Sequence, residues 1–127
     1  MIFGIGTDIV ALARIEALHQ RYGARFAQRI LSTTEMAELQ SQQFPARLLM
    51  KRFAAKEAVA KAAGTGLRHP LSMHNISVVH DAQGKPKFQF AAELASYLTG
   101  LGITSHHLSI SDEREVAVAF VILEGEA

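Results

Sequence analysis

Three side chains of the sequence are of types suited to phosphate chemistry: the carboxylates of Asp8 and Glu57, and the amine of Lys61, which follows Glu57 by one helical turn. Mg²⁺ prefers oxygen ligands and takes only one or two carboxylates from a protein while it keeps waters and binds substrate phosphates. A nearby lysine suits a bound diphosphate. These residues therefore indicate a magnesium and diphosphate site, and phosphoryl-group chemistry follows as a hypothesis.

The helix that carries Glu57 and Lys61 is predicted from Pro45 to Ala63. Proline is tolerated at the first helical position, and the segment is rich in Ala and Leu. At about 100° per residue, Glu57 falls inside the apolar stripe of this helix and Lys56 at its edge. A carboxylate that faces the core without a partner costs several kcal/mol. A surface pair with Lys61 contributes only about 0.2–0.5 kcal/mol, so a metal or anion site is favoured over a simple ion pair.

Asp8 stands at the end of a segment that is predicted to be a short buried strand. Residues 2–9 are β-branched or aromatic with two glycines, and the strand is expected to end at Thr7-Asp8. An aspartate before an amphipathic segment often caps the helix that follows. From the local sequence, a capping role and a metal-binding role for Asp8 are equally supported.

A basic surface follows the first strand. The segment from Ala11 to Tyr22 has helical core spacing, is expected to end at Gly23, and carries Arg14 and Arg21 on one face. Arg25 and Arg29 continue this basic character. Such arginines are usually only solvated, but here they suit the docking of an acidic helix of a partner protein.

The C-terminal half is expected to contain two hairpins separated by a short helix, residues 91–101. The hairpins comprise residues 76–80 with 87–90, and residues 107–111 with 116–123. In the second hairpin, His107, Ser109 and Ser111 share a face made of hydrogen-bonding groups. A strand, then helices, then hairpins predicts an α+β fold with a mainly antiparallel sheet.

The composition predicts one domain, residues 1–127. The chain has 127 residues, of which 49% are hydrophobic and 20% charged, as in ordinary globular proteins. A net charge of +1 provides no global field that would attract nucleic acid. Zero cysteines exclude disulfides and thiolate metal sites and fit a reducing compartment. Because neither a signal peptide nor an apolar run long enough to cross a membrane is recognised, a cytoplasmic location is expected.

Other reactions are poorly supported by the motifs. The Gly4-Ile5-Gly6 segment lacks the third glycine of the dinucleotide-binding fingerprint. Gly64-Thr65-Gly66 follows a helix, so it serves first as a C-terminal cap and cannot present helix N-terminal amides as a P-loop does. The six histidines form no His-Glu-x-x-His pair, and Ser109 lies in no Gly-x-Ser-x-Gly elbow.

In their order and spacing, the motifs resemble those of the bacterial holo-[acyl-carrier-protein] synthase family. Members of this family are phosphopantetheinyl transferases, which move the phosphopantetheine arm of coenzyme A onto a serine of apo acyl-carrier protein and release adenosine bisphosphate. The resemblance covers nearly the whole chain and implies a single-lobed 4′-phosphopantetheinyl transferase fold and a role in fatty acid biosynthesis. It rests on the segments Gly4–Ile9, Arg14-Ile15, Arg52–Ala58, Lys61-Ala62, Gly64–Gly66 and His107–Ser111.

The resemblance also implies roles for individual residues. Asp8 and Glu57 correspond to ligands of Mg²⁺, and Lys61 to a lysine that contacts the diphosphate or the group in transfer. Glu57 is the first candidate for the base that takes the serine proton, directly or through a water. Glu35 is a weaker candidate, because Ser32-Thr33-Thr34-Glu35 matches a helix capping box. The positions that resemble nucleotide-binding ones are Arg52, Lys61, Gly64, His107 and Ser109.

Two protein contacts follow from the same resemblance. The basic helix is expected to meet the acidic recognition helix of the carrier. The chain is also expected to form a homotrimer, in which the polar face at His107 completes a site begun by Asp8 and Glu57 of a neighbouring chain. Many relatives carry a histidine or another residue after Ser111, where this sequence has Asp112, so nucleotide contacts at that position are expected to differ.

Two other functions fit the same residues. One is a non-catalytic module that holds an acidic protein through Arg14, Arg21 and Arg25. It predicts salt-sensitive binding that survives Glu57→Gln. The other is a Mg²⁺-dependent hydrolase of small diphosphates, which predicts release of adenosine bisphosphate without any carrier.

Overall fold

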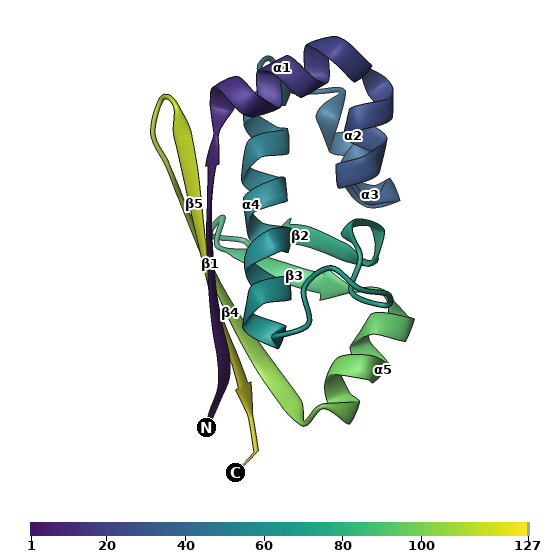
Figure 1. Ribbon diagram of the computed structural model, residues 1–127, viewed down its shortest axis with the longest axis vertical. Helices are drawn as coiled ribbons and strands as arrows, with labels where there is room; N and C mark the ends of the chain where they lie inside the picture. The colour runs from purple at the N-terminus through teal and green to yellow at the C-terminus, as the bar shows by residue number, and fades with distance from the viewer. Residues whose placement is uncertain (127) are drawn as a thin grey trace.

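A long helix, α4 (Pro45–Ala63), lies between a three-stranded sheet and the remaining elements in the computed structural model, which describes residues 1–126 (Figure 1). None of the helices in this part of the chain is long and apolar enough to cross a membrane. The elements, in chain order, are β1 (Ile2–Ala11), α1 (Leu12–Tyr22), α2 (Ala24–Ile30), α3 (Thr33–Leu39), α4, the 3₁₀ helix η1 (Met73–Asn75), β2 (Ile76–His80), β3 (Pro86–Phe90), α5 (Ala92–Gly100), β4 (Ile103–Asp112) and β5 (Val116–Gly125).

The larger sheet has the order β1-β5-β4 and is antiparallel throughout, with β5 in the centre. This position explains the apolar run in β5, because Ala117, Ala119, Val121 and Leu123 are fully buried on the side that packs against α4. Strands β2 and β3 form a separate antiparallel hairpin. Helices α1 to α3 cover one end of α4, and α5 lies near the other end (Figure 1). The predicted α+β fold with mainly antiparallel sheet is confirmed.

Helix α4 begins and ends where its sequence predicts. Pro45 occupies its first turn, and Gly64 follows it with a left-handed φ of 81°, which favours glycine. The prediction that Glu57 faces the core is wrong, because Glu57 is half-buried at the margin of the helix, whereas Arg52 and Lys56 are buried. The sheet, α1, α2 and β2 all contact α4, so no single apolar stripe marks its buried face.

Strand β1 is longer and less buried than its sequence suggests. Its backbone pairs with β5 as far as Ala11 opposite Val116, so Asp8 lies within the strand and not at its end. The N-cap residue of α1 is Ala11, and no side chain caps that helix, which excludes the capping role considered for Asp8. Ile5 and Ile9 are 55% and 67% exposed, because no other element among residues 1–126 covers this part of the sheet.

Two glycines allow the backbones of β1 and α4 to come into contact. A Cβ atom added to Gly6 would lie 1.9 Å from the carbonyl oxygen of Ala58, and one added to Gly4 would lie 1.9 Å from that of Ala62. Only a residue without a side chain fits at this distance. Side chains alternate along a strand, so Asp8 is on the same side as Gly6. The close approach therefore places Asp8 directly against α4.

Candidate active site

Asp8 and Lys61 form an ion pair between β1 and α4. Nζ of Lys61 lies 2.9 Å from Oδ1 of Asp8 and also donates to the carbonyl oxygen of Thr7, at 3.0 Å. The Asp8 side chain is only 15% exposed, whereas the Lys61 side chain is 53% exposed. The carboxylate is thus held in place, while the lysine remains accessible to a substrate.

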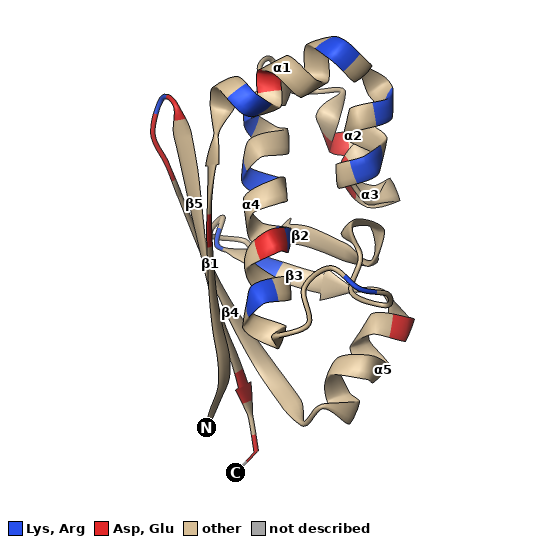
Figure 2. Cartoon of the chain, in the orientation of Figure 1, with Lys and Arg blue, Asp and Glu red and all other residues tan. Residues whose placement is uncertain are grey.

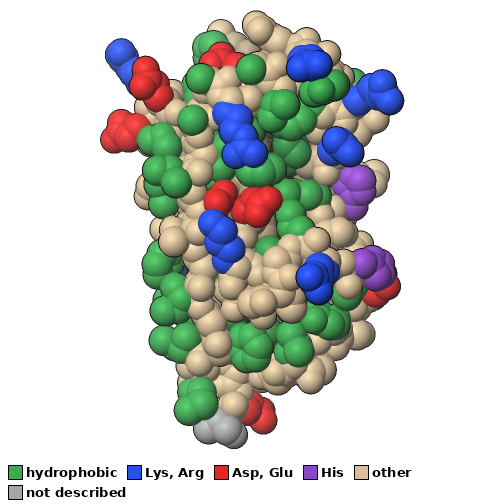
Figure 3. Space-filling view, in the orientation of Figure 1, with side chains coloured by type: hydrophobic (Ala, Val, Ile, Leu, Met, Phe, Trp, Pro, Cys, Tyr) green, Lys and Arg blue, Asp and Glu red, His purple; other side chains and the backbone are tan. Residues whose placement is uncertain are grey.

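Glu57 lies close enough to Asp8 for the two carboxylates to repel each other. The pKa of Glu57 is raised above its ordinary value, first by burial and second by the charge of Asp8, whereas Lys61 and Arg14 act in the opposite direction. Figure 2 shows an acidic position of α4 beside one of β1, and Figure 3 shows acidic side chains between basic ones in the middle of this face. The structure therefore brings together the three residues with which the sequence predicted phosphate chemistry.

This group of residues fits a Mg²⁺ ion that takes the rest of its ligands from elsewhere. A cation between Asp8 and Glu57 would relieve the repulsion that helps to raise the pKa of Glu57. Within residues 1–126, no group of three or more His, Cys, Asp or Glu side chains is placed to hold a metal. Two carboxylates are enough for Mg²⁺ when waters and substrate phosphates complete its coordination. The site therefore suits a metal that is bound together with a phosphate-bearing substrate.

A groove of about 770 Å³ opens between α1, α2, α4 and η1. Figure 3 shows hydrophobic side chains bordered by basic ones in this part of the surface. Arg14 connects the groove with the carboxylates, because its guanidinium lies 5.5 Å from the ring centre of Phe53 and its charge acts on Glu57. The residues that line the groove include Leu18, Arg25, Phe26, Arg29, Ile30 and Phe53.

The sequence identified the arginines near this groove but not its apolar walls. Arg25 and Arg29, which continue the basic character of this part of the sequence, both line the groove. Arg21 is stacked over the ring of Tyr22, at 5.3 Å from its centre. Phe26 lies in a helix of seven residues, which is too short for periodicity to reveal an apolar face.

Arg52 is not part of the carboxylate group at β1. Its buried guanidinium donates to Glu38 at 2.7 Å and to Glu35 at 3.4 Å, both on α3. A nucleotide contact by Arg52 stays a prediction. The capping box of Ser32 and Glu35 is confirmed. Glu35 is also buried and lies 2.6 Å from Nζ of Lys56, which makes it a poor general base.

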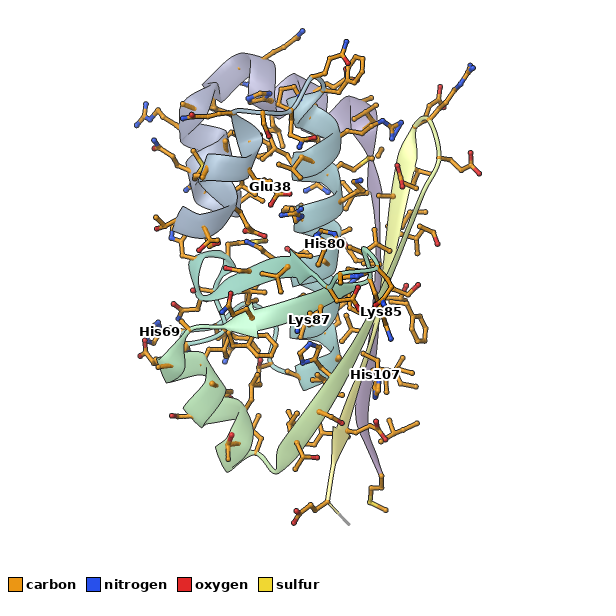
Figure 4. The ribbon with its side chains drawn as sticks, turned by 180° about the vertical axis from the view of Figure 1, so that it is seen from behind. Glu38, His69, His80, Lys85, Lys87 and His107 are labelled. Atoms are coloured by element: carbon orange, nitrogen blue, oxygen red, sulfur yellow. The ribbon has the colours of Figure 1, made fainter. Side chains whose placement is uncertain are left out.

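His107 and Ser109 lie on the side of the sheet that faces away from α4. Their neighbour Leu108 is buried on the opposite side, as the alternation of the strand predicted. Together with Lys85 they line a hollow of about 400 Å³. Figure 4 shows Lys85 and Lys87 on the β2–β3 hairpin, near β4, which carries His107. Within one chain, the sheet separates this hollow from the two carboxylates.

Two further residues from the sequence analysis, Gly64 and Asp112, lie at the ends of elements. Gly64 is exposed at the end of α4, three residues after Lys61, and its nucleotide contact stays a prediction. Asp112 accepts a hydrogen bond from Arg47 at 3.1 Å, and Arg47 also donates to backbone carbonyls of the β4–β5 turn. Asp112 therefore helps to hold this turn against α4.

Comparison with known proteins places the chain in a family. The family model described as the 4′-phosphopantetheinyl transferase superfamily matches residues 4–121. Holo-[acyl-carrier-protein] synthase of Nitrosospira multiformis is 56% identical over 124 residues, which is 98% of this chain and 99% of that protein.

Solved structures agree with this relationship. The crystal structure of holo-[acyl-carrier-protein] synthase from Neisseria meningitidis has a TM-score of 0.95 and 49% identity and covers 98% of this chain and 99% of that one. A synthase from Bacillus anthracis in complex with CoA (3′,5′-ADP) has a TM-score of 0.83 and 37% identity, with 99% of each chain covered. The chain therefore belongs to the holo-[acyl-carrier-protein] synthases of the 4′-phosphopantetheinyl transferase superfamily.

Proposed function

We propose that the protein transfers the 4′-phosphopantetheine group of coenzyme A to a serine of apo acyl-carrier protein, with Mg²⁺ as cofactor. Membership of the family supports a transferase with these two substrates. The observation that carries the proposal is the position of Asp8, Glu57 and Lys61 beside a basic and apolar groove. The three charged side chains suit a diphosphate, and the groove suits a carrier protein. A role in fatty acid biosynthesis in the cytoplasm stays a prediction.

The reaction forms a bond between the serine oxygen of the carrier and the β-phosphorus of coenzyme A. It breaks the bond from that phosphorus to the oxygen that leaves with adenosine 3′,5′-bisphosphate. Asp8 and Glu57 would hold Mg²⁺, which would neutralise the charge of the diphosphate. Lys61, which Asp8 and the carbonyl of Thr7 orient, contacts the diphosphate or the group in transfer. Glu57 takes the serine proton, directly or through a water.

The mass of the carrier tests this function directly. Purified protein, apo carrier and coenzyme A are expected to give a carrier that is heavier by one phosphopantetheine, and only when Mg²⁺ is present. A parallel reaction without carrier separates the transferase from a diphosphate hydrolase, which would release adenosine bisphosphate there. No modified carrier across several carrier proteins would overturn the proposal.

The groove between α1, α2, α4 and η1 is the proposed docking site of the carrier. Its apolar walls can bury one side of a helix, and Arg25 and Arg29 can pair with acidic residues at the edges of that helix. Arg14 lies between the groove and Glu57, so a helix in the groove brings its end close to the carboxylates. Arg14 and Arg21 remain proposed carrier contacts on the same surface.

Reversal of one groove charge tests this docking site. Arg25→Glu is expected to raise the KM for the carrier about tenfold or more and to leave kcat at saturating carrier nearly unchanged, because rim charges act on association. Arg25 is preferred to Arg14, whose charge also acts on Glu57. Arg114→Glu, in the exposed β4–β5 turn, makes the same charge change away from the groove and serves as control. Equal effects of the two variants would contradict the docking site.

The uncovered side of the larger sheet is the proposed interface of a homotrimer. Phe3, Ile5, Ile9 and Phe120 are 42%, 55%, 67% and 43% exposed on neighbouring strands β1 and β5. Exposed apolar patches of this kind mark protein interfaces. The same side of the sheet carries His107 beside Lys85. In a trimer, this hollow would hold the nucleotide part of coenzyme A while the carboxylates of a neighbouring chain hold its diphosphate.

The state of association tests the interface. Wild-type protein is expected to sediment as a trimer, and Phe120→Glu as a monomer with at least about tenfold lower kcat/KM for coenzyme A, because a carboxylate buried in an interface costs several kcal/mol. Ala37→Glu introduces the same charge at an exposed position of α3 and is expected to remain trimeric and active. A monomeric and fully active wild-type protein would contradict this arrangement.

A further inference from the structure

The ammonium group of Lys56 is fully buried, one residue before Glu57 in α4. Nζ donates to Oε1 of Glu35 and to the carbonyl oxygen of Ile30, both at 2.6 Å, and to the carbonyl oxygen of Met73 at 2.9 Å. An ammonium group has three protons, so each finds one acceptor. These acceptors belong to α3, the end of α2 and η1. One side chain therefore ties three elements to α4.

The carboxylate of Glu35, which pairs with Lys56, is itself held by several hydrogen bonds. Its carboxylate, which is 1% exposed, also accepts from the backbone N–H groups of Ser32 and Val78, each at 2.9 Å. Arg52 contacts the same carboxylate at 3.4 Å. The position of Glu35 is thus set by α3, α4 and β2 together, and it gives Lys56 a fixed partner.

Stability alone is a weak explanation for this buried pair. Removing an ion pair from water costs much of what the attraction returns, and well-packed apolar residues often replace such pairs without loss. Burial lowers the pKa of Lys56, although the charge of Glu35 acts to raise it. This lowering reflects the same cost of removing the ammonium group from water. What an apolar residue cannot replace is the directed contact with two backbone carbonyls. The pair therefore determines where the segments at Ile30 and Met73 lie.

Those two segments are walls of the groove. Ile30 and Met73 both line it, and Ile30 ends the helix that carries Arg25 and Arg29. His74 of η1 contacts the carbonyl oxygen of Gln28 at the surface, and Lys56 joins the same two elements from the inside. The interior of α4 is thus connected to the surface that the carrier is proposed to use.

We propose that Lys56 is a positioning residue for carrier recognition, which holds α2 and η1 at the spacing that an acidic carrier helix requires. The inference rests on the proposed function of the groove. Lys56 contacts neither substrate, and its effect passes through the carbonyl groups of Ile30 and Met73. Its loss is expected to alter carrier binding selectively, because Asp8 and Lys61 are held by separate contacts with β1.

Lys56→Met, which keeps the length of the side chain and removes its donors, tests the proposal. The Kd and the KM for apo carrier are expected to rise about tenfold, because the groove loses the preset spacing of α2 and η1, whereas the KM for coenzyme A changes less than about twofold. Lys51→Met, at a half-exposed position of the same helix, is the matched control. Unfolding temperatures of both variants are measured so that kinetics are compared on folded protein.

A second variant covers the case in which Lys56→Met does not fold. Glu35→Gln keeps one oxygen that can accept from Lys56, but it removes the charge and places an NH₂ group against the donors of Arg52 and Val78. It is expected to raise the Kd and the KM for the carrier as well. Equal changes in the KM for both substrates, or a lower unfolding temperature without any change in the carrier KM, overturn the inference. Absence of transfer by the wild-type protein overturns the proposed function itself, so the two failures are distinguishable.

Discussion

Glu57→Gln is expected to lower kcat for transfer by about 10²–10⁴-fold, the range that a general base contributes, while the protein still binds apo carrier. Gln preserves the shape of the side chain but neither binds a proton nor offers Mg²⁺ a charged ligand. Glu57 lies beside Asp8 and not among the residues that line the groove. Single-turnover transfer measured by mass spectrometry gives the rate, and titration calorimetry gives the Kd for the carrier.

The control for this variant is Glu115→Gln in the exposed turn between β4 and β5, which is expected to behave as wild type. Transfer by Glu57→Gln at the wild-type rate would remove Glu57 from the reaction. A parallel loss of carrier binding would show that Glu57 acts on docking instead of on the chemical step. Loss of transfer with binding retained also excludes a purely non-catalytic module, provided that wild-type protein transfers the group.

Gly6→Ala is expected to lower the free energy of unfolding by about 1–3 kcal/mol or more, which is the usual cost of overpacking a tight contact. The added Cβ would lie 1.9 Å from the carbonyl oxygen of Ala58 and 2.6 Å from the backbone nitrogen of Ala62, so β1 and α4 must move apart. Asp8 would then be displaced from Glu57. Thermal unfolding should show a lower midpoint, and transfer should be slower at temperatures where the variant is folded.

Gly100→Ala is the matched control for Gly6→Ala. Gly100 lies in α5 without a positive φ, and a Cβ atom there would meet no atom of another described element within 4 Å. This variant is expected to be as stable as wild type or up to about 1 kcal/mol more stable, because alanine restricts the unfolded chain. Wild-type stability and rate in Gly6→Ala would show that the contact between β1 and α4 does not position Asp8.

The structure agrees with the prediction where the sequence contains a strong local signal for a helix end or a turn. Pro45 and Gly64 mark the ends of α4, and the Ser32–Glu35 capping box begins α3. Gly84, with a φ of 84°, lies in the turn of the predicted hairpin. Each signal acts through backbone geometry or a hydrogen bond within a few residues, so it does not depend on the rest of the fold.

The chemistry of the site was also readable from residue types and spacing. Glu57 and Lys61 are one turn apart on a helix, and only Asp8 had to be brought to them by the fold. What the spacing left undecided was the role of Asp8, because a capping residue and a metal ligand look alike in sequence. The pairing of β1 with β5 beyond Asp8 removed the capping role.

The sequence by itself therefore determined the ends of α4, the fold class and the set of residues suited to a metal and a diphosphate. Only the tertiary structure decided which charge of α4 is buried, since it places Lys56 inside and leaves Glu57 at the margin. It also decided that Gly4 and Gly6 bring β1 into contact with α4. Periodicity describes a helix with one buried face, whereas α4 is covered from several sides, and the partners that cover it lie far away in the chain.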